Sequence, residues 1–592
     1  MITIISKIKN RYILQTVLGA LLAVATASCT DLQEEVIDEV LGSAHANPEN
    51  ALAAAYGQMA SSTFVDHGNV FGLQEYSTDE ALLPTRGSDW GDGGKWRAIH
   101  EFTWAADNAV VTSTWNNLNS GITKSLTAIA AIEAQDFANK ELFLAEAKGL
   151  LAFYTFHTLD LFGQAPYRTP SDPDAPLEIR KAESSIDALI QEVESLLPKL
   201  ASVNENSTHN GRFTKEAGHA LLADMYLNRA VFKDRYASTF NFNEPAVGGT
   251  GTDMDKVIEH TSVLINDNRF QLEENYFRNF DIDNDNGSEL IFVVKQDINT
   301  QRSSDNDFAY MPMERNQKPS PANRGTNATC ITPEFYETWA NNHDDPRFHR
   351  HYRYADGTWF MNNGTDVSVP ANSIVPNSNN LPWFHFNRGI QSGQQYGPKL
   401  LSSGDFERTS DGRIKISMLY CEKNTSLPMD FTPALNFDNP RQSVFTQAQI
   451  NRGARVFKYE FDPERDNGSS HVDIPLYRLG GIYCMRAEAY FRRGNTAEAL
   501  ADVNILRTSR KRESLFNNAP GKPISALTEM TLLRETGFEL YWEMYRRKAL
   551  IRFGKFNAGG SVRPVSENTR RIYPIPQTTL DASAAFEQNE GY

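Results

Sequence analysis

Hydrophobic residues in the first half of the chain recur with the period of an α-helix. Leu52, Tyr56 and Met59 share one face of the first such segment, because side chains three or four positions apart line the same side of a helix. The segments 113–134 and 141–163 show the same period, and they are predicted to pack as an antiparallel pair. Further helices are predicted at 184–200, 214–232 and 254–267.

The pattern changes between residues 279 and 470. Helical periodicity is scarce there, Asn, Gly, Pro and aromatic residues are dense, and the strand-like runs 289–294 and 455–461 are short. This stretch is predicted to be a loop-rich, strand-poor insert.

Helical periodicity returns with 474–494, 495–510 and 525–550. The first two of these segments are joined by a tight Gly-Asn turn and carry Ala at close-contact positions, which is typical of tetratricopeptide-like helix pairs. The sequence therefore predicts a mainly α-helical domain over 47–592. Its scaffold covers about 47–278 and 471–592, and the insert covers about 279–470.

The N-terminus has the layout of a secretory signal. Lys7, Lys9 and Arg11 precede an uncharged stretch that ends in small residues. A transmembrane anchor is the alternative, but this stretch is short and contains polar side chains. Residues 1–28 are predicted to be an export signal.

The signal stops at Cys29, whose thiol is a candidate for acylation. The small residues before Cys29 resemble a bacterial lipoprotein processing site, although Thr26 stands where Leu is usual. Residues 29–46 are rich in Asp and Glu and are predicted to be a flexible acidic tether.

Charge and cysteine content narrow the range of possible functions. The chain has 592 residues with 58 Lys and Arg against 74 Asp and Glu, a net charge of −16. Loss of residues 1–28 removes three basic and no acidic side chains and makes the charge −19. No basic stripe is present, so nucleic-acid binding is not expected. Cys330, Cys421 and Cys484 form no CxxC pair and are predicted to be buried free thiols, with no disulfide and no zinc site.

No enzyme signature is present in the sequence. Motifs of serine hydrolases, zinc proteases and nucleotide-binding enzymes are absent. Glycoside hydrolysis needs only two carboxylates, which spacing does not reveal, so a surface glycoside hydrolase remains the alternative from a different class.

No cofactor or metal is expected. Residues 281–289 alternate Asp as a calcium loop does, but Gly and Glu are misplaced for that motif, and a solvated turn is favoured. The histidines at 343–351 are interleaved with arginines that oppose a cation, which favours a surface strand or loop.

Five collinear segments carry a family resemblance: 145–167, 211–228, 344–348, 472–507 and 573–592. Together with the lipoprotein signal, they resemble the SusD/RagB family of Bacteroidota outer-membrane nutrient-binding lipoproteins. The chain departs from the family at Ala152, where Arg is usual, and at Arg534-Glu535-Thr536. Both departures concern scaffold helices.

The resemblance implies four tetratricopeptide-like helix pairs as scaffold and an irregular ligand-binding part. It also implies a lipid-anchored protein of the outer membrane, facing the cell exterior, that captures oligosaccharides for a SusC-like TonB-dependent transporter. A peptide ligand is the alternative within the family.

Two regions suit sugar binding, which needs flat aromatic faces beside polar groups. The first contains Trp90 and Trp96 with Asp66, Asn69, Arg86 and Asp89, and the second contains Trp359, Trp383, Arg388 and Tyr396. Trp90 is the strongest candidate, because its Gly-rich surroundings offer little apolar surface. Packing is the competing interpretation for each of these tryptophans. Trp104, Trp115 and Trp339 are predicted to belong to the core.

Overall fold

The computed structural model describes residues 47–592, apart from 171, 173, 206–207, 297–305, 372–373, 376–380, 440–441 and 463–469. The predicted signal, Cys29 and the tether lie outside the described residues. Residues 47–592 form one unit of the chain. No helix described in it is long and apolar enough to cross a lipid bilayer.

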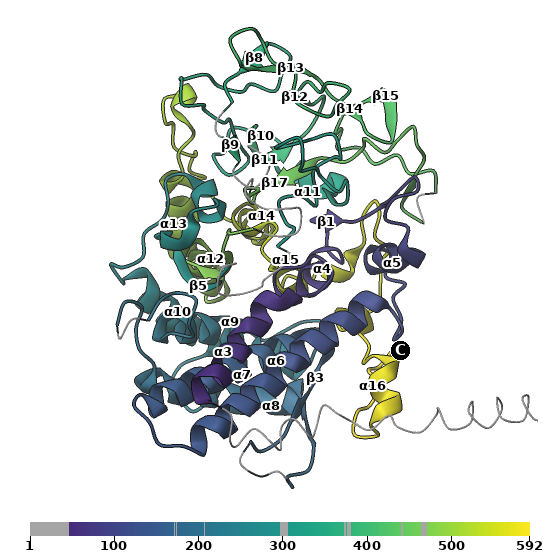
Figure 1. Ribbon diagram of the computed structural model, residues 1–592. Coiled ribbons are helices and arrows are strands. Elements are labelled where there is room, and N and C mark those ends of the chain that lie inside the picture. The colour runs from purple at the N-terminus through teal and green to yellow at the C-terminus, as the bar shows by residue number, and fades with distance from the viewer. Residues whose placement is uncertain are drawn as a thin grey trace, which may run out of the picture. The chain divides into compact units, whose positions relative to one another are not determined.

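Helices dominate this unit, as the sequence predicts (Figure 1). The predicted packing of α6 against α7 and of α12 against α13 is confirmed, and α8 packs against α9. The helices are α3 Pro48–Gln58, α4 Val70–Glu75, α5 Lys95–Glu101, α6 Ala109–Glu133, α7 Lys140–Phe162, α8 Ala182–Leu196, α9 Lys215–Lys233, α10 Asp253–Ile265, α11 Pro333–Thr338, α12 Leu479–Arg492, α13 Thr496–Ser509, α14 Glu529–Leu540, α15 Arg546–Arg552 and α16 Gln577–Ala582.

Local chemistry explains where helices start and how closely they pack. The Asn47 side chain accepts the backbone N–H of Asn50 at 3.0 Å and caps α3. Gly121 in α6 faces Tyr154 in α7, where a Cβ would lie 2.3 Å from the tyrosine ring. Glycine is therefore required for this close helix contact.

Most of the short strands belong to the loop-rich part, and in Figure 1 β8, β12, β13, β14 and β15 lie at the opposite end from α3 and α6–α9, whereas β3 lies beside α6 and α8. The strands are β1 Ala81–Leu82, β2 Thr85–Arg86, β3 Gln164–Tyr167, β4 Glu178–Lys181, β5 Leu290–Val294, β6 Cys330–Ile331, β7 His349–Arg350, β8 Ser368–Val369, β9 Ile374–Val375, β10 Leu381–Pro382, β11 Arg388–Gln391, β12 Tyr396–Pro398, β13 Ile414–Met418, β14 Tyr420–Cys421, β15 Asn424–Pro428, β16 Val444–Phe445, β17 Arg455–Phe457 and β18 Ile474–Arg478. Two three-stranded sheets stand out, with orders β17-β11-β7 and β12-β13-β8.

Two helix predictions near the C-terminus need correction. Residues 474–478 form β18, which pairs antiparallel with β5, instead of starting a helix. The segment predicted as one helix over 525–550 is interrupted after α14, because Trp542 and Met544 adopt left-handed backbone angles before α15 begins.

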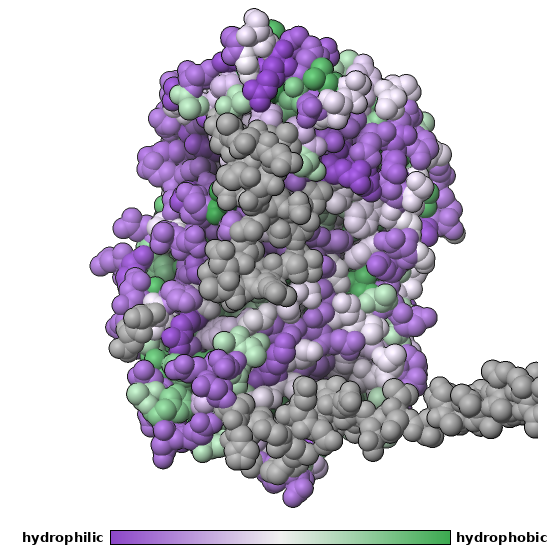
Figure 2. Space-filling view, viewed as in Figure 1, coloured by the Kyte–Doolittle hydropathy of each residue, from purple (hydrophilic) through white to green (hydrophobic). Residues whose placement is uncertain are grey.

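The core residues agree with the sequence prediction. Trp104, Trp115 and Trp339 are buried, and Cys330, Cys421 and Cys484 are buried free thiols. Figure 2 shows that one face of the molecule is mostly hydrophilic, with hydrophobic residues only in small groups.

Candidate functional site

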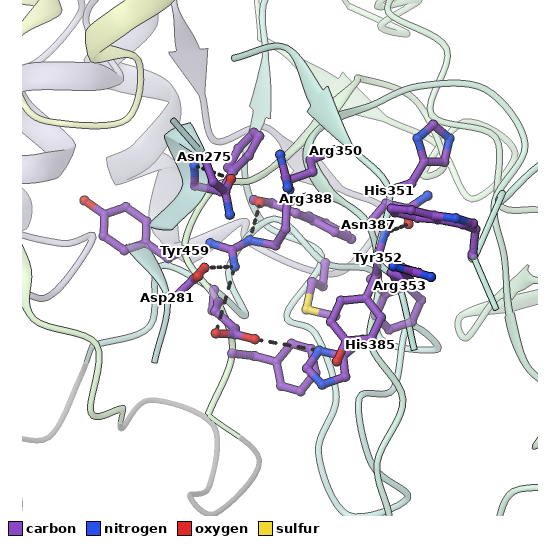
Figure 3. Close-up of a pocket in the computed structure, with 18 of the residues that line it drawn as sticks. Asn275, Asp281, Arg350, His351, Tyr352, Arg353, His385, Asn387, Arg388 and Tyr459 are labelled. Atoms are coloured by element: carbon purple, nitrogen blue, oxygen red, sulfur yellow. Dashed lines mark hydrogen bonds and ion pairs between the residues drawn. The ribbon is translucent and has the colours of Figure 1, made fainter. Parts of the chain in front are cut away.

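A cavity of about 360 Å³ opens in the loop-rich part of the molecule (Figure 3). We call it the central pocket. Its charged, imidazole and amide lining includes Asn275, Asp281, Arg350, His351, Arg353, Asn387, Arg388, Glu460 and Asn518. Its aromatic lining consists of Phe277, Tyr352, Trp359, His385, Phe386, Phe457, Tyr459 and Phe461.

The sheet β17-β11-β7 positions the arginines of the pocket. Arg388 on β11 lies directly opposite Arg350 on β7 in the antiparallel register. The next residue, Gly389, has φ of +86°, and a Cβ there would lie 2.3 Å from the carbonyl oxygen of Phe348. Glycine at this point lets β11 approach β7, which brings the two arginine side chains to one cavity.

Three rings form a continuous stack beside the cavity. The His385 ring lies parallel to Tyr352, with centroids 3.8 Å apart and 9° between planes. The His385 ring also contacts Trp383, with centroids 4.1 Å apart and 32° between planes. Burial lowers the pKa of His385 well below its ordinary value, so the imidazole is neutral. The stack is therefore an uncharged aromatic surface.

Trp359 adds a separate aromatic face to the pocket. The Arg353 guanidinium lies over its ring, 5.5 Å from the centroid. Trp359 is half-buried while Arg353 is exposed. An apolar face next to a cation suits the C–H side of a sugar ring and its polar substituents.

Arg388 is held by the protein itself. Its Nη1 lies 2.6 Å from Oδ1 of Asp281, and its other nitrogens donate to backbone carbonyls that include Phe280 and Phe457. Glu460 lies 4.0 Å from the same guanidinium. Burial raises the pKa of Glu460 to about 7, although Arg388 acts in the opposite direction. Glu460 is thus the carboxyl group of the pocket that titrates near neutrality.

Several pocket groups retain unused bonding capacity. Among the described residues, Arg350 and Arg353 have no carboxylate within ion-pair distance. The Arg350 side chain donates to the Lys511 carbonyl at 3.3 Å and to no other acceptor in the described part of the chain. Within the same part of the chain, the buried Nδ2 of Asn387 and Nε1 of Trp383 have no hydrogen-bond partner. Such donors are available to a ligand's oxygens.

The other predicted region forms an aromatic cluster of its own. Trp90 and Trp96 meet edge to face, with centroids 6.4 Å apart, and both rings contact His67. Trp96 is buried and Trp90 is half-buried. Trp90 donates its ring N–H to the Thr326 carbonyl at 2.9 Å. Trp90 thus has apolar neighbours, contrary to the expectation from its Gly-rich loop, and keeps only part of its ring accessible.

The polar residues predicted beside Trp90 differ in their accessibility. Arg86 is 1% exposed and donates to three backbone carbonyls, and Asn69 is buried against Ser113 and Asn117. These two side chains hold the loop in place. Asp66 and Asp89 are half-buried. Asp89 lies 3.1 Å from Arg315.

The structure therefore divides the ten predicted site residues among different places. Trp359 and Arg388 line the central pocket, and Trp383 reaches it through the ring stack. Tyr396 lies on β12 opposite Met418 and is not part of the pocket lining.

Sequence reasoning missed Tyr352 and His385, together with Arg350 and Arg353. The first hint is in the segment 349–354, where arginines alternate with histidine and tyrosine. The histidines at 343–351 make internal contacts: His351 lies 2.6 Å from Glu513, and His343 stacks on Phe348. The other hint is the run of four ring-bearing residues at 383–386, shortly before Arg388.

The candidate calcium loop is occupied by internal ion pairs. Asp281 contacts Arg388, Asp283 contacts Arg278, and Asp285 lies 3.4 Å from Lys295. Within the described ranges, no group of three or more potential metal-ligating side chains comes together.

A helical scaffold with tetratricopeptide-like pairs, beside a loop-rich part, is the architecture of the SusD class. The SusD family model matches residues 288–592, and the chain belongs to that family. It is similar to the starch-binding protein SusD of Bacteroides thetaiotaomicron, with 25% identity over 549 residues that cover 88% of this chain and 85% of that protein.

Solved structures show the same fold. A laminarin binding SusD-like protein matches with a TM-score of 0.61 and 17% identity, covering 92% of this chain and 99% of that chain. Surface glycan-binding protein A from Bacteroides thetaiotaomicron, in complex with laminarihexaose, matches with a TM-score of 0.58 and 15% identity, covering 92% and 98%.

Proposed function

We propose that this protein is a cell-surface glycan-binding lipoprotein that captures oligosaccharides in the central pocket. The observation that carries the proposal is the pocket itself. It combines the Trp383–His385–Tyr352 stack, the Trp359 face and unpartnered donors in one cavity. Sugar recognition requires these two kinds of surface together.

Family membership supports the same proposal. Proteins of this fold include ones described as binding starch, laminarin and laminarihexaose. We propose no catalytic role for the chain, and the glycan remains whole while it is bound. The Trp90–Trp96 cluster, with Asp66 and Asp89 beside it, is a second proposed contact surface for a longer chain.

The cellular part of the proposal rests on the N-terminal sequence and the family. Acylation of Cys29 would attach the protein to the outer membrane, and the 29–46 tether would leave the binding domain free to face the exterior. A bound oligosaccharide would then pass to a SusC-like TonB-dependent transporter.

A binding assay paired with a product assay tests the proposed function. The purified protein would be run through gels containing a panel of polysaccharides, and the same mixtures would be assayed for new reducing ends. Retarded migration without product supports capture. New reducing ends would instead support the glycoside hydrolase alternative, and binding of peptides in place of glycans would support a peptide carrier.

Two substitutions identify the surface that binds. Trp359→Ala changes the central pocket, and Trp90→Ala changes the second cluster. Tyr490→Ala, at a half-buried tyrosine of the scaffold helix α12, is the matched control. Loss of binding in Trp359→Ala with Tyr490→Ala unchanged supports the central pocket. Loss of binding in Trp90→Ala alone would indicate that the second cluster is the binding site.

A further inference from the structure

The charge of the central pocket differs from that of the whole protein. The chain carries a net charge of −16. Yet the pocket lining contains three arginines and only two carboxyl groups, Asp281 and Glu460. A local excess of positive charge in an acidic protein favours a negatively charged ligand at that point.

Ion pairing and burial together leave the excess positive charge on two of the three arginines. Arg388 and Asp281 neutralise each other at 2.6 Å. Glu460 is close to Arg388 and His385, at 4.0 and 3.7 Å, and burial makes its charged form unfavourable. Arg350 and Arg353 remain, neither with a carboxylate at ion-pair distance among the described residues, and Glu513 and Asp281 act on Arg350 only from farther away.

These two arginines border the aromatic surfaces on which a sugar would stack. The Arg353 guanidinium lies over Trp359. Arg350 lies two residues before Tyr352, the end member of the ring stack. Figure 3 shows Arg350, Arg353 and Arg388 around the same cavity. An acidic group on a stacked sugar would therefore lie within reach of a guanidinium.

We propose that the oligosaccharide captured in the central pocket is anionic, carrying uronic acid carboxylates or sulfate esters that Arg350 and Arg353 bind. This inference rests on the proposed function, because it assumes that the pocket holds a glycan. Both anionic groups present planar or tripodal oxygens that accept paired N–H bonds from a guanidinium.

The first test compares each acidic glycan with a neutral form of the same chain. Hexagalacturonate is compared with its methyl ester, and a sulfated galactan oligosaccharide with its desulfated form, by isothermal titration calorimetry. We expect at least one acidic member to bind about tenfold or more tightly than its neutral partner, and the difference to shrink at high salt. The carboxylate and sulfate arms distinguish the two sources of charge.

The second test removes one guanidinium at a time. Arg353→Gln and Arg350→Gln should each weaken binding of the acidic glycan about tenfold and leave the affinity for the neutral form nearly unchanged. Arg353 is exposed, so its replacement should not disturb folding even if that of Arg350 does. Arg493→Gln is the matched control, at a surface arginine of the scaffold that pairs with Asp255.

The possible results separate this inference from the proposed function. Equal binding of acidic and neutral forms, with Trp359→Ala weakening both, overturns the proposal of an anionic ligand and still supports glycan capture. Preference for neutral glycans across the panel overturns it as well. Binding of hexaglutamate as tight as that of the glycans overturns it in favour of an acidic peptide. Failure of every glycan to bind overturns both proposals.

Discussion

At the scale of single residues, Trp359 and Trp339 are two tryptophans of one sequence region that lie in different environments. Trp339 is fully buried and stacks on Phe538 with centroids 3.6 Å apart. Trp359 is half-buried, and its described ring contact is the Arg353 cation at the pocket. A ring in the first position stabilises the fold, whereas a ring in the second is available to a ligand.

Replacement of Trp359 should therefore affect binding more than stability. Trp359→Ala is expected to weaken oligosaccharide binding by about 1–3 kcal/mol, or roughly 5- to 150-fold, with a small change in thermal midpoint. Trp339→Ala should instead cost about 3–5 kcal/mol of unfolding free energy. Calorimetric titration and thermal unfolding of both variants check this. A large fall in midpoint with normal affinity for Trp359→Ala would show that its ring is structural.

Glu460 gives the pocket a pH dependence. Burial raises the pKa of Glu460 to about 7. As the pH rises through that value the carboxylate becomes charged and repels an anionic ligand, so affinity for acidic oligosaccharides should fall between pH 6 and pH 8. Glu460→Gln should remove much of this slope, that is, of the change in affinity with pH.

Comparison of Glu460→Gln with the unaltered protein isolates the contribution of Glu460 to the pH dependence of binding. The groups that face it, Asp281, Asp283, Arg388 and His385, are present in both. Binding isotherms at pH 6, 7 and 8 provide the measurement, and a neutral oligosaccharide serves as the control. The same slope in Glu460→Gln as in the unaltered protein would exclude this carboxyl group as the cause.

At the scale of elements, the helices could be predicted and part of the C-terminal region could not. Regular spacing of apolar residues is a local property, so α6, α7 and α9 follow directly from it. β18 depends on pairing with β5, which lies far away in the sequence. Its run of apolar residues suits a helix or a strand equally well until that partner is known.

A buried charge network joins β18 to helix α14. Glu539 on α14 lies 2.7 Å from Arg478 of β18, 2.6 Å from Arg510 and 3.3 Å from Arg347. All four side chains are almost completely buried. Burial alone would raise the pKa of Glu539, but these guanidiniums hold that pKa well below its ordinary value. Its stabilising contribution is therefore present at neutral pH and is lost only as the pH falls toward that lowered pKa.

Removal of the Glu539 charge should destabilise the protein strongly at neutral pH. Glu539→Gln leaves buried guanidiniums without their shared carboxylate, which is expected to cost about 3–5 kcal/mol of unfolding free energy. Glu529→Gln, at an exposed position in the first turn of the same helix, should cost less than about 1 kcal/mol. Denaturant unfolding at pH 7 measures both. Equal midpoints for the two variants would contradict a stabilising role for the network.

At the scale of the whole molecule, the sequence predicts a binding site in the insert, and the central pocket lies mainly there, but the full lining of that pocket could not be predicted. The density of aromatic residues between 279 and 470 pointed to Trp359 and Arg388, which line the pocket. The remaining lining comes from segments that are distant in sequence, such as 275–281, 350–353 and 514–518. Only β-sheet pairing and loop packing bring these segments together, and no local pattern encodes that.

The attachment of the whole molecule to the membrane depends, in our proposal, on one thiol outside the described residues. Cys29→Ser should move the protein from the membrane fraction to the soluble exported fraction, while its thermal midpoint and glycan affinity stay the same. The physical reason is that stable anchoring requires at least two acyl chains, and an acidic tether adds only repulsion from anionic lipids. Cys484→Ser, at a buried thiol of the scaffold, is the matched control and should remain with the membrane. Fractionation of cells that express each variant, followed by immunoblotting, gives the answer, and a Cys29→Ser protein that still sediments with membranes would contradict lipid anchoring at this residue.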